Sequence, residues 1–198
     1  MLARIMKSKA MGKLWAMVAL WCTAVSGAAP VRFELRDTNG VLHTAGEWRG
    51  RRAVVLFFTM TDCPVANGYV PAMNRLRAVY EPRGVAFYAV QTDTTVADAD
   101  AKKYAQEFQY TFPLLNDPRL TLARLTGAKV TPEVAVLSPS GEVLYLGRID
   151  NKVEDLTKPR YAATEPELRN ALDAVLGGKA PKERRTRAVG CAINLETK

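Results

Sequence analysis

The sequence predicts an α/β fold with a central mixed β-sheet flanked by helices, in three α/β/α layers. Apolar runs typical of buried strands alternate with amphipathic segments typical of helices, as expected when helices cover both faces of one sheet. Two of the later runs are joined by the short turn 138–141, which predicts an antiparallel hairpin within that sheet. No internal repeat or low-complexity tract interrupts this alternation.

The first half of the chain opens with a strand over 32–36, whose residues alternate in polarity, and a turn over 37–40 that contains an Asn-Gly pair. The apolar run 53–60 is rich in β-branched and aromatic residues, so it predicts a central strand. Apolar side chains recur every three or four residues over 64–80, which predicts a helix with one buried face. Residues 85–91 predict the next buried strand.

The second half continues the alternation. The elements expected there are a helix over 97–108, a strand over 112–115, a helix over 120–125, paired strands over 134–137 and 143–146, and a helix over 165–176. Glycines follow the second and third of these helices, as is common at helix C-termini. The order of elements therefore favours one sheet with helices on both faces.

Cys63 stands where the central strand ends and the helix over 64–80 begins. Free backbone amides and the positive end of the helix dipole at that position favour a thiolate. Asp62, next to it, is expected to raise the pKa of the thiol and so to oppose this effect. The alternative is that Cys63 is a small buried apolar residue, but the strand–Cys–helix context favours a reactive thiol.

The N-terminus predicts export. Residues 1–28 contain four basic residues, then an uncharged apolar stretch over 14–25 and small residues before a cleavage point after Ala28. We expect a signal peptide over 1–28, a single domain over 29–178, and a basic linker with a cysteine-containing tail over 179–198. The product would be periplasmic or secreted, with no membrane span in the mature chain. A retained N-terminal anchor is the alternative, although the apolar stretch is short for a membrane span.

The net charge of the mature protein excludes few classes of partner. The formal net charge of +8 falls by the four basic residues of the signal segment to +4. Arg184, Arg185 and Arg187 cluster in the linker, where they form either a patch for an acidic partner or a solvated segment. Aromatic residues are not interleaved with basic ones, so nothing indicates nucleic-acid binding.

Several stretches resemble a known family. Residues 35–40 and 48–58 are similar to the entry into the catalytic strand of secreted redoxins of the AhpC/TSA (thiol-specific antioxidant) type, in the thioredoxin-like superfamily. Thr131-Pro132 resembles the cis-proline loop that faces the active cysteine in that fold. The resemblance implies a thioredoxin-like fold in which the Pro132 backbone positions a substrate. An ordinary proline at the start of a strand is the alternative.

The end of the chain adds to this resemblance. Residues 147–150 and the Val-Gly-Cys sequence that ends at Cys191 are similar to secreted bacterial redoxins with such a C-terminal tail. Export removes Cys22, so the mature chain keeps only Cys63 and Cys191. A mixed disulfide or sulfenic acid on Cys63 needs a second thiol to resolve it, and Cys191 is the only candidate. A bond between them either cycles during catalysis or staples the tail permanently, and the sequence leaves both open.

The chain departs from the family pattern in ways that bear on mechanism. Ala66 occupies the second cysteine position of a thioredoxin Cys-x-x-Cys motif, and Phe57 stands where thioredoxins bury a carboxylate. The peroxiredoxin signature is also absent, because Leu56 and Met60 hold its proline and hydroxyl positions. An ordinary peroxidase is therefore weakly supported.

The leading hypothesis is a thiol-disulfide oxidoreductase or peroxiredoxin-like thiol reductase of the bacterial envelope. Cys63 would be the nucleophile, Cys191 the resolving thiol, Pro132 the backbone that positions the substrate, and Thr61 a hydrogen-bond donor to the thiolate. We expect a protein dithiol or disulfide, or a small peroxide or disulfide, as substrate. An external electron donor completes the cycle, and no cofactor or metal is expected.

Two alternatives stay open. One is a non-catalytic thioredoxin-like binding module stapled by a structural Cys63–Cys191 disulfide. The other is a copper metallochaperone, which usually has a Cys-x-x-x-Cys pair and a distant histidine. Asn67 replaces the second cysteine of that pair, and His43 is expected in a solvent-exposed loop rather than as a ligand.

Overall fold

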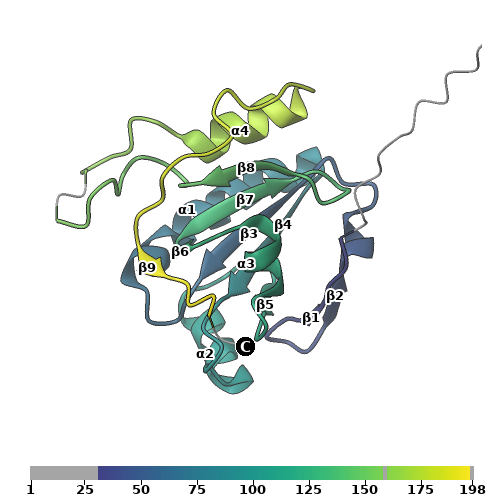
Figure 1. Cartoon of the computed structure of the whole chain (residues 1–198), viewed down its shortest axis with the longest axis vertical. Coiled ribbons are helices and arrows are strands. Elements are labelled where there is room, and N and C mark those ends of the chain that lie inside the picture. Colours follow the sequence, from purple (N-terminus) through teal and green to yellow (C-terminus); the bar gives the residue numbers. More distant parts are fainter. Residues whose placement is uncertain (1–30, 158–159, 197–198) are drawn as a thin grey trace, which may run out of the picture.

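The computed structural model describes residues 31–157 and 160–196, and it is built around a mixed five-stranded sheet (Figure 1). The strand order is β5-β4-β3-β7-β8. Strands β3, β4 and β5 run parallel, while β7 is antiparallel to both β3 and β8. The bounds of these strands are β3 Ala53–Thr59, β4 Val85–Gln91, β5 Leu114–Asn116, β7 Glu133–Leu137 and β8 Val143–Gly147. The predicted signal peptide lies outside the described residues.

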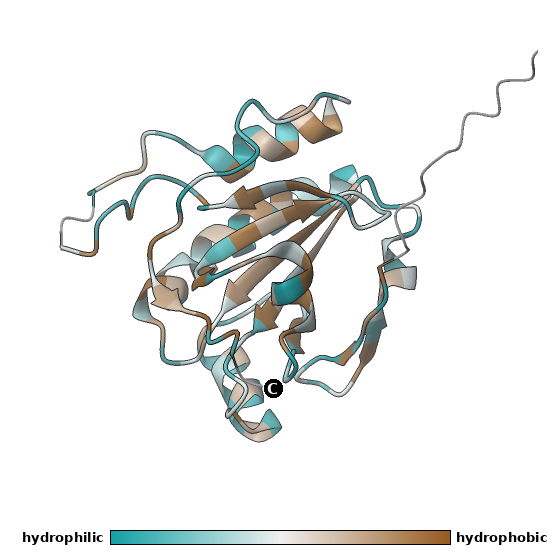
Figure 2. Cartoon of the chain, in the orientation of Figure 1, coloured by the Kyte–Doolittle hydropathy of each residue, from teal (hydrophilic) through white to brown (hydrophobic). Residues whose placement is uncertain are grey.

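The central strand β3 is buried along its whole length, so its side chains feed two hydrophobic clusters. Val55 and Phe57 point to one face of the sheet, and Val54, Leu56 and Phe58 point to the other. This alternation follows from the two-residue repeat of a strand. Figure 2 shows the strands of the sheet as mostly hydrophobic. A run that is apolar at every position is thus explained by helices or loops on both faces.

Helices cover both faces, which confirms the predicted α/β/α layers. Side chains of α1, α2 and α4 join the cluster on one face, and those of α3 and η1 join the cluster on the other. The helices are η1 Ala45–Trp48, α1 Pro64–Tyr80, η2 Glu81–Arg83, α2 Asp98–Glu107, α3 Thr121–Thr126 and α4 Glu167–Leu176. Gly127, with a φ of 78°, ends α3 as expected, since a left-handed residue suits a helix C-terminus.

The hairpin of β1 (Glu34–Arg36) and β2 (Leu42–Thr44) corrects one prediction. His43 is not in an exposed loop but lies in β2 and is only 8% exposed. Its Nδ1 is 2.9 Å from a carboxylate oxygen of Glu47, and its Nε2 is 3.4 Å from one of Asp37. The ring also meets Tyr88 edge-on. These polar partners allow the imidazole to be buried.

The backbone of the linker after α4 is docked on the body, while the clustered Arg184, Arg185 and Arg187 are exposed, as expected of a solvated segment. Arg185 forms a parallel bridge with Leu146 of β8, and the Leu146 amide donates to the Arg184 carbonyl at 3.0 Å. A Cβ on Gly147 would lie 2.1 Å from the Thr186 hydroxyl oxygen and 2.8 Å from the Thr186 backbone, so only glycine lets the linker approach here. The chain then continues to the short strand β9 (Cys191–Ala192), as Figure 1 shows.

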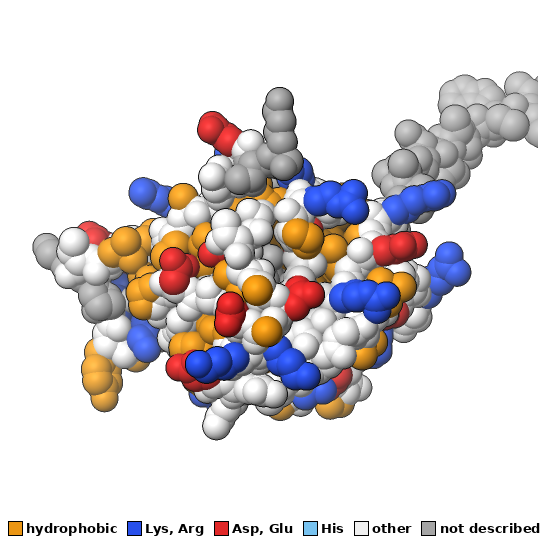
Figure 3. Space-filling view, turned by 90° about the horizontal axis from the view of Figure 1, so that it is seen from below, with side chains coloured by type: hydrophobic (Ala, Val, Ile, Leu, Met, Phe, Trp, Pro, Cys, Tyr) orange, Lys and Arg blue, Asp and Glu red, His pale blue; other side chains and the backbone are white. Residues whose placement is uncertain are grey.

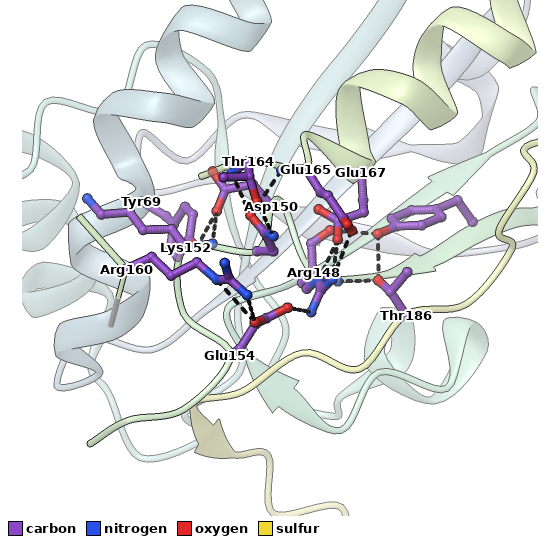
Figure 4. Close-up of polar contacts among 12 residues, drawn as sticks. Tyr69, Arg148, Asp150, Lys152, Glu154, Arg160, Thr164, Glu165, Glu167 and Thr186 are labelled. Carbon is purple, nitrogen blue, oxygen red and sulfur yellow. Dashed lines mark hydrogen bonds and ion pairs between the residues drawn. The ribbon is translucent and has the colours of Figure 1, made fainter. Parts of the chain in front are cut away.

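A polar network holds the linker and the loop before α4 against the sheet (Figure 4). Arg148 pairs with Glu154, Glu165 and Glu167, and its backbone amide donates to the Thr186 hydroxyl at 3.0 Å. The Tyr145 and Thr186 hydroxyls are 2.7 Å apart. The start of the tail is therefore fixed to the body by side-chain contacts as well as by backbone pairing.

Acidic and basic side chains are interspersed over the face that Figure 3 shows. In the part of the chain that the structure describes, no helix has the length and apolar character needed to cross a bilayer.

Candidate active site

Cys63 lies where the sequence predicts it, between β3 and α1. It is the N-cap residue of α1 and is followed by Pro64 at the first helical position, a favoured place for proline because no amide is lost from the hydrogen-bond ladder. The Asn67 amide donates to the Cys63 carbonyl at 3.0 Å and closes the first turn. The Cys63 side chain is fully buried, at 0% exposure.

The cis-proline loop meets the sulfur directly. The Thr131-Pro132 peptide bond is cis, as the resemblance implies, and the Cys63 thiol donates to the Thr131 carbonyl at 3.1 Å. The Thr131 hydroxyl is buried and has no hydrogen-bond partner among the described residues while Cys63 is a thiol. It is therefore free to donate to the Cys63 sulfur once that sulfur is a thiolate, which favours the charged form and lowers the pKa of Cys63.

Cys191 is brought to the same place by an antiparallel pairing. Strand β9 pairs with β6 (Val130–Thr131), so that Cys191 lies opposite Thr131 and Ala192 opposite Val130. The Ile193 amide extends the pairing by donating to the Lys129 carbonyl at 2.8 Å. Both cysteines are free thiols in the structure. The two sulfurs that the sequence singles out thus meet on one backbone segment, the loop that precedes Pro132.

The two thiols are electrostatically unequal. Burial acts to raise the pKa of Cys63, but hydrogen bonds from the side chains of Cys191 and Thr131 and from the backbone amides of Ala66 and Cys191 outweigh it and lower that pKa. Burial, the hydrogen bond to Cys63 and the charges of Cys63 and Asp62 raise the pKa of Cys191 to about 12. Cys63 is therefore the thiol that loses its proton first, while Cys191 keeps its proton.

Thr61 does not occupy the role that the sequence assigns to it. Its backbone carbonyl accepts from the Asn67 side chain at 3.3 Å, and its hydroxyl is not among the groups that lower the pKa of Cys63. The hydroxyl beside the sulfur belongs to Thr131. Sequence reasoning reaches Thr131 only as the residue before a proline, because its proximity to Cys63 depends on how β3 and β7 pair. Asp62 likewise acts on Cys191 rather than on Cys63.

A buried hydroxyl cluster behind the first turn of α1 was not predicted. The Tyr104 hydroxyl lies 2.9 Å from that of Thr59 and 3.0 Å from that of Tyr110, and it donates to the Asn67 side chain at 2.8 Å. Burial raises the pKa of Tyr104 and of Tyr110. Tyrosines spaced along α2 and the following loop carry no sequence signal for this cluster, because only the packing of α2 against α1 brings them together.

Glu133 also holds the loop that precedes Pro132. This carboxylate is 8% exposed and accepts from the Lys129 amide at 2.8 Å. Burial raises its pKa, while the amides of Lys129 and Val130 and the charge of Arg185 act in the opposite direction. The side chain therefore holds the start of β6, the strand on which the tail lies, and faces the linker that leads to the tail.

The described residues contain no group of three or more His, Cys, Asp or Glu side chains placed to hold an ion. Ala66, buried at the position of a thioredoxin's second cysteine, adds no ligand. Two adjacent thiols of unequal pKa are instead the chemistry of thiol-disulfide exchange.

Comparison with known proteins agrees with this chemistry. The model of the AhpC/TSA family matches residues 25–146, more than half of the chain. This chain belongs to the AhpC/TSA family. The thiol-disulfide oxidoreductase ResA of Geobacillus thermodenitrificans is 30% identical to it over 120 residues, which cover 61% of this chain and 67% of that protein. The resemblance seen in the sequence is thereby confirmed at the level of the family.

Solved structures confirm the fold. A hypothetical protein of Sinorhizobium meliloti superposes with a TM-score of 0.74 at 25% identity, covering 87% of this chain and 95% of that one. A protein of Chlorobium tepidum assigned as the thiol:disulfide interchange protein DsbE gives a TM-score of 0.53 at 27% identity, covering 61% and 82%. The fold is thioredoxin-like, with thiol-disulfide oxidoreductase or peroxiredoxin-like chemistry among its relatives.

Proposed function

We propose that this chain is a two-cysteine thiol-disulfide oxidoreductase in which Cys63 attacks the substrate and Cys191 resolves the intermediate. The observation that carries the proposal is the β6–β9 pairing, which places Cys191 opposite Thr131 while the Cys63 thiol donates to the carbonyl of the same residue. The missing second cysteine of a Cys-x-x-Cys motif is thus supplied from the far end of the chain.

The reaction follows from the unequal thiols. The Cys63 thiolate attacks one sulfur of a substrate disulfide, which forms a mixed disulfide and releases the other sulfur as a thiolate. Cys191, after losing its proton to that leaving thiolate, attacks the Cys63 sulfur, forms the Cys63–Cys191 disulfide and frees the reduced substrate. The substrate gains two electrons, and an external dithiol returns them by reducing the Cys63–Cys191 bond. Run in reverse, the same steps oxidise a protein dithiol.

A small peroxide is the second candidate substrate, favoured by the complete burial of Cys63. The thiolate would attack one peroxide oxygen, become a sulfenic acid and release an alcohol or water. Cys191 would then displace water from the sulfenic acid and form the same disulfide. Both candidates share the resolving step, so that step is the one to test first.

Trapping tests the roles of the two cysteines. Reduced Cys191→Ser protein mixed with an excess of a small disulfide should accumulate a stable adduct on Cys63, seen by intact mass, whereas wild-type protein should proceed to an internal disulfide. Replacing the disulfide with hydrogen peroxide separates the two candidate substrates. Adducts on Cys191 in a Cys63→Ser control at the wild-type rate would overturn the assignment.

A redox titration decides between a cycling bond and a structural staple. Glutathione mixtures of known potential should give a midpoint above about −300 mV for a catalytic disulfide, and a midpoint below that value for a structural one. A structural value would favour the non-catalytic binding module.

We also propose that the protein is exported to the periplasm or secreted. Charged, apolar and small-residue regions follow one another over 1–28, and the compartment reached by such a signal is oxidising. Intact mass of the protein recovered from the cell envelope should begin at Ala29, and a product that keeps Met1 in the cytoplasm would contradict export.

A further inference from the structure

The tail occupies a backbone edge beside the nucleophile. Within the described chain, β6 pairs only with β9, and β9 pairs only with β6. Each strand is two residues long, and beyond it the tail is held by buried Ile193, whose amide donates to the Lys129 carbonyl, and by the Arg124 side chain, which donates to the Leu195 carbonyl at 2.8 Å. Departure of β9 would leave the amides and carbonyls of Val130 and Thr131 free to pair with another extended segment.

The same departure is needed for any large substrate. Cys63 is fully buried, and Cys191 packs against the cluster that contains it. A disulfide carried by a folded or extended protein therefore cannot reach the Cys63 sulfur while the tail is in place. Opening of the tail exposes the sulfur and the β6 edge together, because both lie under the same segment.

Gly190 shows which residue can stand before a cysteine that pairs with Thr131 of β6. A Cβ at this position would lie 1.9 Å from the Thr131 carbonyl oxygen, 2.7 Å from its carbon and 3.1 Å from Cδ of Pro132. The obstruction is backbone, which no rotamer change relieves. That carbonyl also accepts from the Cys63 thiol, so it cannot turn away without disturbing the nucleophile. A segment that places a cysteine opposite Thr131 in this register therefore needs glycine immediately before that cysteine.

We propose that the tail is an intramolecular stand-in for the substrate, and that the β6 edge selects extended protein segments with a Gly-Cys sequence. This inference rests on the proposed thiol-disulfide exchange. The substrate segment pairs with Val130 and Thr131 as β9 does, and presents its cysteine to Cys63. After the mixed disulfide forms, the tail returns to the edge and resolves it. Because the tail is tethered, it competes at a high effective concentration.

Two peptides that differ by one methyl group test the selection. Val-Gly-Cys-Ala-Ile and Val-Ala-Cys-Ala-Ile are each converted to the mixed disulfide with thionitrobenzoate. Attack of Cys63 on the peptide sulfur releases coloured thionitrobenzoate, so its rate is read directly. With reduced wild-type protein we expect the glycine peptide to react at least about tenfold faster, the factor given by 1.4 kcal/mol. Equal rates for the two peptides would overturn the proposal.

A variant of the tail tests the competition. Gly190→Ala should push β9 off β6 and raise the rate of the glycine peptide several-fold. Gly68→Ala, where the new Cβ meets nothing within 4 Å, is the matched control and should leave the rate within twofold. No acceleration in Gly190→Ala would overturn the stand-in role.

Failure of the proposed function would give a different set of reaction rates from failure of the Gly-Cys selection. In that case reduced wild-type protein reacts with neither peptide nor with the free thionitrobenzoate disulfide, or a Cys63→Ser variant reacts as fast as wild type. Rapid reaction with the free reagent combined with equal peptide rates rejects the selection alone.

Discussion

The two cysteines reach one site by different routes. Cys63 is placed by its sequence neighbours, because a buried strand ends and a helix begins within a few residues of it. Cys191 is placed by a two-residue pairing with a strand far away in the sequence and by a linker fixed along β8. The proposed nucleophile is thus part of the core, whereas the proposed resolving thiol lies on a two-residue edge strand, which we propose can leave. This difference predicts unequal responses to matched changes in the two regions.

The largest difference is expected between the cysteines themselves. Cys63→Ser should abolish reduction of a model disulfide, since no other described thiol has a lowered pKa. Cys191→Ser should allow one stoichiometric reaction and then stop, with turnover reduced at least about a hundredfold. Single-turnover and steady-state rates measured on the same samples separate the two. A Cys191→Ser variant with full turnover would show that the external donor resolves the mixed disulfide directly.

Core truncations should separate the body from the tail by stability. Leu56 and Ile193 belong to the same hydrophobic cluster, one in β3 and one beyond β9. Leu56→Ala should lower the free energy of unfolding by roughly 2–5 kcal/mol, because the site cannot collapse. Ile193→Ala should cost less, since the tail can detach, but should speed alkylation of Cys63. Urea unfolding and alkylation with iodoacetamide measure both, and equal losses of stability would mean that the tail folds as part of the core.

The sequence predicts the parts of the structure that depend on local patterns, and it misses the parts that depend on contacts between distant segments. The apolar run of β3, the helix after Cys63 and the hairpin of β7 and β8 are local patterns, so the sequence predicts them within one or two residues. For the docking of the tail, the local sequence offers only one sign, which is the Gly190-Cys191 pair. The packing of His43 against Tyr88, the meeting of Thr131 with Cys63 and the Tyr104 cluster depend on distant contacts, which no spacing along the chain encodes. The contacts of His43 with Glu47 and of Glu133 with Lys129 are local, but nothing in their spacing marks them in the sequence.

A matched pair of threonines tests which hydroxyl tunes Cys63. The pKa of Cys63 is lowered, so its thiolate, the reactive form, persists as pH falls below the ordinary pKa of a cysteine. Thr131→Val removes a donor to the thiolate and should raise that pKa, moving the midpoint of the alkylation rate against pH upward by about one unit, or roughly 1.4 kcal/mol. Thr61→Val should leave the midpoint unchanged. The reverse result would restore Thr61 to the role that the sequence assigns to it.

The smallest effect is expected where the linker meets the body. Thr186→Val keeps the side-chain volume but removes the hydroxyl that meets Tyr145 at 2.7 Å and accepts from the Arg148 amide at 3.0 Å. Loss of a partner for buried polar groups should lower the free energy of unfolding by about 1–2 kcal/mol. The start of the tail would be held less firmly, so formation of the Cys63–Cys191 disulfide after attack should slow by a few fold while the attack itself keeps its rate. Stopped-flow mixing with a model disulfide resolves the two phases. Thr157→Val, in an exposed turn before α4, is the control and should change neither. Slowing of attack instead of resolution would mean that the linker supports Cys63 as well as Cys191, and that the two regions are not independent.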